Sequence, residues 1–122
     1  MTTGGCEWVI DAFDCDPKSL ADQDRLRRLF DSLVETLSLH PIGESRWHQF
    51  PSRSGVAPGG ITGMTLLAES HIACHTFPEH GSMCLNVFCC RARPDGDFAR
   101  LLKQEFQAGE VRVKRIDRPY QR

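Results

Sequence analysis

Residues 61–90 read ITGMTLLAESHIACHTFPEHGSMCLNVFCC and contain three apolar segments that are rich in β-forming residues. The segments cover residues 61–68, 71–77 and 83–90, and turn-forming residues separate them. Short β-branched and aromatic runs, bounded by polar residues, Pro and Gly, are typical of strands. The stretch therefore predicts three strands in the middle of the chain, the first two joined through a bend.

Further strands are expected on both sides of this stretch. They are short β-forming or alternating runs at residues 6–14, at residues 45–50 and around Val111 and Val113. In the first of these strands, Trp8, Ile10 and Ala12 fall on one side of the chain. Residues 51–60 contain two prolines and three glycines, which favour a loop.

Two helices are predicted from apolar residues that recur at the spacing of one helical face. The first begins near Asp22 and Asp24 and is expected to end before Pro41. Its stripe consists of Leu26, Leu29, Phe30, Leu33, Val34 and Leu37. The second is expected to end at Gly109. Its stripe consists of Phe98, Leu101, Leu102 and Phe106.

The expected order of elements is β-α-β-β-β-β-α-β, within a single domain that covers residues 1–122. Since each helix has only one apolar stripe, the predicted fold class is α+β. We expect a two-layer sandwich, a mainly antiparallel sheet with two helices on one face. The other face of the sheet then lacks a cover within the chain, and we expect a subunit partner to cover it.

The composition excludes several classes of function. The chain carries 15 Lys and Arg against 16 Asp and Glu, a formal charge of −1, which leaves no basic excess for binding nucleic acid. Its uncharged apolar stretches reach only about ten residues, too short to cross a membrane. Residues 1–5 show no export signal. We therefore expect a cytoplasmic protein with no nucleic-acid or membrane partner.

Most of the reactive side chains fall in residues 71–90, where three mechanisms compete. The first is a metal site, whose possible ligands are His71, His75, Glu79, Cys84 and one of Cys89 and Cys90. No CxxC or other ligand motif is present, and on a strand the two histidines share a face but lie far apart. We predict no metal, and in a reducing compartment we expect the six cysteines to be free thiols.

The other two mechanisms are covalent. One is a cysteine nucleophile activated by His75. The other is self-cleavage, in which the hydroxyl of Ser70 attacks the carbonyl of Glu69 and turns that amide into an ester. No protease or acyl-transfer signature surrounds the cysteines, and a bare Glu-Ser dipeptide occurs by chance in many chains. On residue types alone, the alternatives stay open.

Three segments resemble the small prokaryotic pyruvoyl-dependent S-adenosylmethionine decarboxylases. They are LLAESH at residues 66–71, HTFPE at residues 75–79 and VFCC at residues 87–90. The resemblance implies a lyase that decarboxylates S-adenosylmethionine through a Schiff base and supplies the aminopropyl donor for spermidine and polyamine biosynthesis. The cofactor would be a pyruvoyl group derived from Ser70, which accepts the electron pair released with carbon dioxide.

The resemblance also implies a zymogen that cleaves itself between Glu69 and Ser70. In the family the serine attacks the preceding carbonyl, and the ester that forms undergoes β-elimination. Hydrolysis of the resulting dehydroalanine leaves the pyruvoyl group. The products here would be a β chain of residues 1–69 and an α chain of residues 70–122.

Five further residues match functional positions of the family. The resemblance assigns the proton transfers of processing to His75 and an assisting hydroxyl to Thr62. Cys90 matches the cysteine that protonates the substrate α-carbon after decarboxylation. Glu79 matches the carboxylate that receives the ribose hydroxyls, and Phe50 resembles the aromatic residue that stacks on adenine.

Phe77 stands where relatives usually carry Trp, and we expect it beside the substrate. Asn86 and Arg91 also depart from the family pattern. The alternatives are therefore a pyruvoyl-dependent ornithine or arginine decarboxylase and a non-enzymatic module that binds polyamines or nucleosides. Relatives pair as dimers with sites near the subunit contact, so the expected assembly is a homodimer of cleaved αβ units.

The remaining reactive side chains are expected to have structural roles. His40 is predicted to cap the end of the first helix or to interact with its dipole. Cys89 is predicted to face away from Cys90. The thiols expected to be buried or half-buried are Cys6, Cys15, Cys74 and Cys84.

Overall fold

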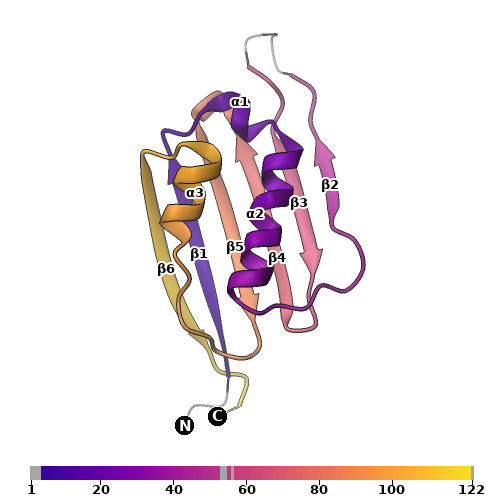
Figure 1. Cartoon of the computed structure of the whole chain (residues 1–122), viewed down its shortest axis with the longest axis vertical. Coiled ribbons are helices and arrows are strands. Elements are labelled where there is room, and N and C mark those ends of the chain that lie inside the picture. Colours follow the sequence, from indigo (N-terminus) through magenta and orange to yellow (C-terminus); the bar gives the residue numbers. More distant parts are fainter. Residues whose placement is uncertain (1–3, 53–54, 56, 122) are drawn as a thin grey trace.

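Six antiparallel strands form one layer of the structure, and the two long helices lie across one face of this sheet (Figure 1). The computed structural model describes residues 4–52, 55 and 57–121. The strand order is β2-β3-β4-β5-β1-β6. The elements are β1 (Gly5–Phe13), α1 (Pro17–Leu20), α2 (Gln23–Thr36), β2 (Arg46–Gln49), β3 (Ile61–Leu66), β4 (Ser70–Phe77), the 3-10 turn η1 (Pro78–His80), β5 (Ser82–Cys89), α3 (Phe98–Phe106) and β6 (Glu110–Arg118). The predicted α+β two-layer sandwich is confirmed.

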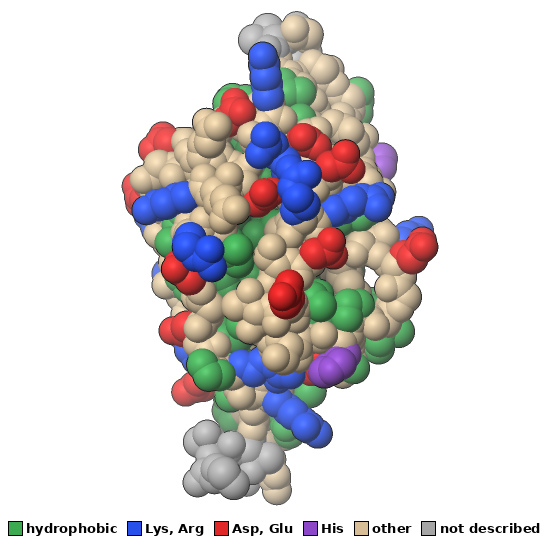
Figure 2. All heavy atoms as spheres, in the orientation of Figure 1, with side chains coloured by type: hydrophobic (Ala, Val, Ile, Leu, Met, Phe, Trp, Pro, Cys, Tyr) green, Lys and Arg blue, Asp and Glu red, His purple; other side chains and the backbone are tan. Residues whose placement is uncertain are grey.

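Alternation along the strands separates a buried face from an open one. In β1, Trp8 and Ile10 have no exposed surface, whereas Val9 and Asp11 between them are partly exposed. Both helices lie on the buried side and contribute their apolar stripes to the core: Leu26, Leu29, Phe30 and Leu33 from α2 and Phe98, Leu101, Leu102 and Phe106 from α3. Figure 2 views the helix side, where acidic and basic side chains are mixed over the surface.

The strand β4 occupies the middle of the sheet and pairs with β3 on one side and with β5 on the other. Its inward residues Ile72 and Cys74 are fully buried, and its outward residues His75 and Phe77 are exposed. We call the side of the sheet opposite the helices the outer face. Large apolar side chains are exposed on that face: Met64, Leu66, Phe77 and Ile116.

Two short elements were absent from the sequence prediction, α1 and η1. The start signal of α1 is clear, because Pro17 occupies its first turn and the Asp16 carboxylate accepts hydrogen bonds from the Lys18 N–H and the Ser19 hydroxyl. A four-residue helix is too short to show an apolar stripe. Periodicity alone therefore does not predict it.

The second long helix ends before the glycine that was predicted to stop it. Gln107 follows α3 in a left-handed conformation with φ of 57°, and its N–H donates to the Lys103 carbonyl at 2.9 Å. Gly109 has a different role, because its N–H donates to the Phe13 carbonyl at 2.9 Å. A Cβ at Gly109 would lie 2.9 Å from the Cβ of Asp14, so the close approach of the two chains requires glycine.

The limits of the strands differ by a few residues from the prediction. The strand expected over 61–68 ends at Leu66, because the next residues form the turn into β4. Residues 53, 54 and 56 of the predicted 51–60 loop lie outside the described residues. Within the described ranges, the helices lack the length and apolar character required to cross a bilayer.

The packing of α3 on the sheet predicts a large cost for cavity formation at Leu102, which has no exposed surface. Leu102→Ala should lower the free energy of unfolding by about 2–5 kcal/mol, because it removes buried methyl groups and leaves a cavity. Ile42→Ala is the matched control, since Ile42 is 58% exposed, and it should cost about 0.5 kcal/mol or less. Urea denaturation of both variants in a Ser70→Ala background, expected to remain one chain, measures the difference. Equal costs at the two positions would contradict the described core.

Candidate active site

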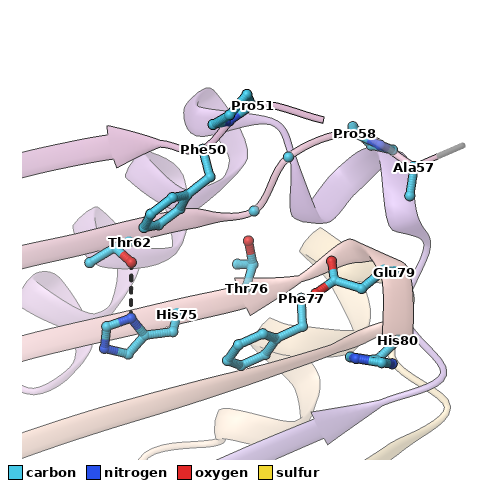
Figure 3. A pocket seen from close by; sticks show the side chains of 12 residues that line it. Phe50, Pro51, Ala57, Pro58, Thr62, His75, Thr76, Phe77, Glu79 and His80 are labelled. Atoms are coloured by element: carbon cyan, nitrogen blue, oxygen red, sulfur yellow. Dashed lines mark hydrogen bonds between the residues drawn. The ribbon is translucent and has the colours of Figure 1, made fainter. Parts of the chain in front are cut away.

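A pocket of about 740 Å³ opens between the loop that follows β2 and the end of β4 (Figure 3). Five residues singled out from the sequence line it: Phe50, Thr62, His75, Phe77 and Glu79. Phe50 directly follows β2, and the others come from β3, β4 and η1. The volume lies within the range of small-molecule sites, and the lining combines aromatic rings with a few polar groups.

The polar centre of this pocket is a pair of side chains on neighbouring strands. Thr62 of β3 and His75 of β4 are direct cross-strand partners, and the Thr62 Oγ1 lies 3.0 Å from the His75 Nδ1 (Figure 3). The hydroxyl therefore fixes the orientation of the imidazole ring. Because Nδ1 is engaged, Nε2 is the ring nitrogen left to exchange a proton with a group in the pocket.

Two glycines shape the aromatic side of the pocket. The Phe50 N–H donates to the Gly60 carbonyl at 2.9 Å, which closes the loop after β2. A Cβ at Gly59 would lie 1.6 Å from the Phe50 carbonyl oxygen, and one at Gly60 would lie 2.3 Å from the Thr76 carbonyl oxygen. Glycine is therefore required for the loop to return close to Phe50 and to β4.

A second group of predicted residues lies at the other end of β4. Ser70 is the first residue of that strand and pairs with Cys89 of β5. The backbone N–H of Cys90 donates to the carbonyl oxygen of Glu69 at 2.8 Å. This is the carbonyl that the Ser70 hydroxyl would attack. A donor in this position polarises the carbonyl and stabilises negative charge that develops on its oxygen.

The side chain of Glu69 is also held, although the residue is only 8% exposed. Its carboxylate accepts hydrogen bonds from the His40 N–H at 3.0 Å and from the His40 Nδ1, and the Arg93 Nη2 lies 3.5 Å away. Burial raises the pKa of Glu69, but the hydrogen bonds from the ring and the backbone of His40 outweigh it and hold the pKa below its ordinary value of 4.5. The prediction of a local helix cap at His40 is replaced by this long-range contact, which has no signature in the sequence.

The two groups do not meet within one chain. Ser70 and His75 are five residues apart on one extended strand, so their Cα atoms lie about 17 Å from each other. Cys90 lies at the Ser70 end, and Thr62 lies at the His75 end. One chain therefore carries two incomplete halves of the predicted catalytic set.

The thiols divide by burial. The predicted opposition of Cys89 and Cys90 is confirmed, since Cys89 is fully buried and Cys90 is partly exposed. Burial raises the pKa of Cys89 to about 11 and that of Cys74 to about 12, so both stay protonated. Cys84 is exposed, contrary to the prediction, because it lies on the outer face of β5.

The alternative mechanisms find little support in this arrangement. Cys84 pairs with His75 across the strands. Partial desolvation of its thiol, together with the hydrogen bond and the charge of Asp11, raises the pKa of Cys84, which opposes a reactive thiolate. His71 and His75 lie four residues apart on β4, about 13 Å in an extended strand. Among the described residues, no three His, Cys, Asp or Glu side chains are grouped closely enough to hold a metal ion.

The comparison with known proteins decides the family. The sequence model of the S-adenosylmethionine decarboxylase family matches residues 6–119. The chain belongs to this family.

Two similar relatives of the family are S-adenosylmethionine decarboxylase proenzymes. The one from Pyrococcus abyssi is 31% identical over 119 residues, which cover 97% of this chain and 81% of the relative. The one from Thermococcus kodakarensis is 33% identical over 120 residues, which cover 97% of this chain and 78% of the relative.

The family resemblance extends to the fold. The crystal structure of the adenosylmethionine decarboxylase from Aquifex aeolicus VF5 aligns with a TM-score of 0.76 and 26% sequence identity. The alignment covers 100% of this chain and 96% of that chain. Family membership therefore applies to the whole sandwich, including both ends of β4.

The contacts of Glu69 predict an acid-dependent contribution to stability. Because folding lowers the pKa of Glu69, its ionised carboxylate stabilises the fold above pH 4.5, and this contribution is lost as the pH falls through the lowered value. In a Ser70→Ala background, Glu69→Gln should destabilise the protein at neutral pH and cost progressively less toward pH 3. Urea denaturation across this range measures the difference.

The matched control is Glu35→Gln, on the exposed side of α2, which should cost little at any pH. A cost of Glu69→Gln that stays constant from neutral pH to pH 3 would contradict the assigned ionic contacts.

Proposed function

We propose that this chain is a proenzyme that cleaves itself between Glu69 and Ser70 and then decarboxylates S-adenosylmethionine. The product is the aminopropyl donor for spermidine and other polyamines. The observation that carries the proposal is the Cys90 N–H on the Glu69 carbonyl, directly beside Ser70, in a chain of this family. All six cysteines lie among the described residues as free thiols, which suits a cytoplasmic enzyme.

The cleavage is a balanced rearrangement of one peptide bond. The Ser70 Oγ attacks the Glu69 carbonyl carbon, the C–N bond breaks, and the hydroxyl proton ends on the freed nitrogen. Loss of the Ser70 Cα proton then breaks the Cβ–Oγ bond, which releases Glu69 as a carboxylate and leaves dehydroalanine at residue 70. Addition of water and loss of ammonia complete the pyruvoyl group. Cys90 supplies the N–H for the oxyanion of the first step, and His75 is the proton carrier.

The residues around position 70 fit a pyruvoyl group. Such a group binds the amine of an amino acid and withdraws the electrons that leave with carbon dioxide. Cys90 adjoins this position through its bond to Glu69, and its thiol is the proton donor to the substrate α-carbon. Cys89 points into the core and is fully buried, so it does not compete with Cys90 for this role.

The pocket at the other end of β4 suits the nucleoside part of the substrate. Phe50 and Phe77 offer ring faces to adenine, and the Glu79 carboxylate accepts hydrogen bonds from the ribose hydroxyls. Ornithine and arginine carry neither a base nor a ribose. The aromatic lining therefore favours S-adenosylmethionine as the substrate.

A homodimer joins the two halves of the site. Two copies packed through their outer faces, with a two-fold axis near the paired residues Ala73 and Asn86, place the Ser70 end of one copy over the His75 end of the other. The uncovered apolar side chains on that face support this packing, since they stay exposed in a single chain. The helix side carries mixed acidic and basic side chains, which favour contact with solvent over contact with a second copy (Figure 2).

Self-cleavage predicts two fragments of residues 1–69 and 70–122 by denaturing mass spectrometry. Ser70→Ala should remain one chain and release no carbon dioxide, because it lacks the attacking hydroxyl. Cys90→Ala should still split, and its decarboxylation should fall by about 10²–10⁴-fold, because the proton donor is lost.

The substrate is tested on the cleaved protein by carbon dioxide release from S-adenosylmethionine, ornithine and arginine. Release from either amino acid but not from S-adenosylmethionine would replace the proposed substrate. A wild-type chain that stays whole under every condition would favour the non-enzymatic binding module.

The shared site predicts complementation between two inactive variants. Ser70→Ala and His75→Ala, expressed separately, should each stay whole. When they are co-expressed with tags of different length, about half of the His75→Ala chains should be cleaved, since mixed dimers provide an intact His75 opposite their Ser70. Mass spectrometry of the separated chains measures the cleaved fraction. Cleaved wild type with no cleavage in the mixture would contradict the shared site.

A further inference from the structure

We infer that His40 is a positioning residue for self-cleavage. His40 and Arg93 hold the Glu69 carboxylate so that the carbonyl of the same residue stays on the Cys90 N–H and within reach of Ser70. The inference rests on the proposed cleavage between Glu69 and Ser70. It assigns a role to a residue outside the AESH, HTFPE and VFCC motifs.

Two residues contact the Glu69 carboxylate, His40 and Arg93. His40 donates to the carboxylate twice, through its backbone N–H at 3.0 Å and through Nδ1. A carboxylate only accepts hydrogen bonds, so Nδ1 carries the proton. The Glu69 side chain is 10% exposed, and the Arg93 Nη2 lies 3.5 Å from Oε2, the same carboxylate oxygen that faces the His40 Nδ1. The side chain therefore has little freedom to rotate.

The segment that carries His40 is tied to the turn before the cleavage site. The His40 carbonyl accepts the Ala68 N–H at 2.8 Å, and the Ile42 N–H donates to the Leu66 carbonyl at 2.8 Å. A bridge between Pro41 and Leu67 lies between these two bonds. Residues 40–42 thus run alongside the turn as a short extra strand and bring the imidazole to Glu69.

Arg93 connects the same carboxylate to the segment that precedes His40. Its Nε donates to the Leu37 carbonyl at 2.6 Å and its Nη2 to the Ser38 carbonyl at 3.1 Å, so the guanidinium links the end of α2 to Glu69. Arg93 follows Cys90 by three residues and belongs to the segment whose N–H holds the Glu69 carbonyl. The backbone carbonyl and the side chain of Glu69 are therefore both fixed by hydrogen bonds.

A fixed position of the Glu69 carbonyl affects the rate of the first step of cleavage. The Glu69 carbon becomes tetrahedral and its oxygen becomes negative, so the Cys90 donor must stay aligned while Ser70 attacks. A displacement of about 1 Å in a reacting group slows a reaction by as much as about 10²-fold. Loss of the His40 imidazole should therefore slow cleavage by about 10- to 100-fold, with the slow step before the ester.

The test follows the cleavage rate of freshly translated precursor by denaturing electrophoresis. His40→Ala removes the ring, and His40→Asn places an amide N–H where Nδ1 lies. We expect slow cleavage in His40→Ala and recovery to within about threefold of wild type in His40→Asn, because the donor returns. Arg100→Ala is the matched surface control, since Arg100 pairs only with the exposed Asp97 in the described residues, and it should cleave at the wild-type rate.

Two further measurements separate positioning from misfolding. In the Ser70→Ala background, His40→Ala should keep a cooperative urea transition. Hydroxylamine cleaves an accumulated ester, and it should release no extra fragment from His40→Ala, because the ester does not form. If His40→Ala fails to fold, Glu69→Gln, which keeps the size of the side chain, should show slow cleavage with the same lack of response to hydroxylamine.

The inference is overturned if a folded His40→Ala cleaves at the wild-type rate, if His40→Asn is as slow as His40→Ala, or if hydroxylamine releases the fragment that begins with Ser70. If Glu69→Gln is used instead, the inference is also overturned when this variant cleaves at the wild-type rate or when hydroxylamine releases the fragment from it. A wild-type precursor that never splits at Glu69–Ser70 would instead refute the proposed function. The two failures are therefore distinguishable.

Discussion

The hydrogen bonding of β4 on both edges is the constraint on which the site depends. A strand paired with β3 and β5 along its length cannot bend to bring its ends together. It therefore presents Ser70 at one end and His75 at the other. The same pairing places a functional residue beside each end of β4. Cys90, which follows β5, lies at the Ser70 end, and Thr62 of β3 lies at the His75 end.

The placement of both helices on one side follows from their single apolar stripes and has a functional consequence. The helices cover Trp8, Ile10 and the other inward residues, and they leave the outer face with polar site residues among apolar ones. A third layer of helices there would have blocked the pocket side of His75. In the proposed homodimer, the open face is both the contact surface for the second copy and the wall of the site.

Much of the fold could be predicted from the sequence, because it depends on local periodicity. Alternation in β1 and the Leu-rich stripe of α2 determine which sides are buried, and the structure agrees with both. The distance between Ser70 and His75 also follows from the rise of a strand once both are placed on it. The family resemblance, rather than spacing, brought Phe50, Thr62 and Glu79 into one candidate site, and the structure places them around one pocket with His75.

Other features depend on contacts between distant segments, and the sequence has no pattern for them. His40 and Glu69 are 29 positions apart, and Arg93 approaches from a third segment. The exposure of Cys84 depends on which side of β5 faces the helices. The helix α3 ends where Gln107 adopts a left-handed conformation. In the sequence, Gly109 two residues later is the stronger signal for a helix end.

A pyruvoyl group at position 70 can be detected directly by its reaction with a hydrazine. The purified protein is treated with phenylhydrazine, and the modified peptide is located by tandem mass spectrometry. We expect one adduct, at the first residue of the 70–122 fragment. The untreated fragment should be one ammonia lighter than the same peptide beginning with serine. A 70–122 fragment that begins with an unmodified Ser70 and never takes up the reagent would contradict the proposed pyruvoyl group.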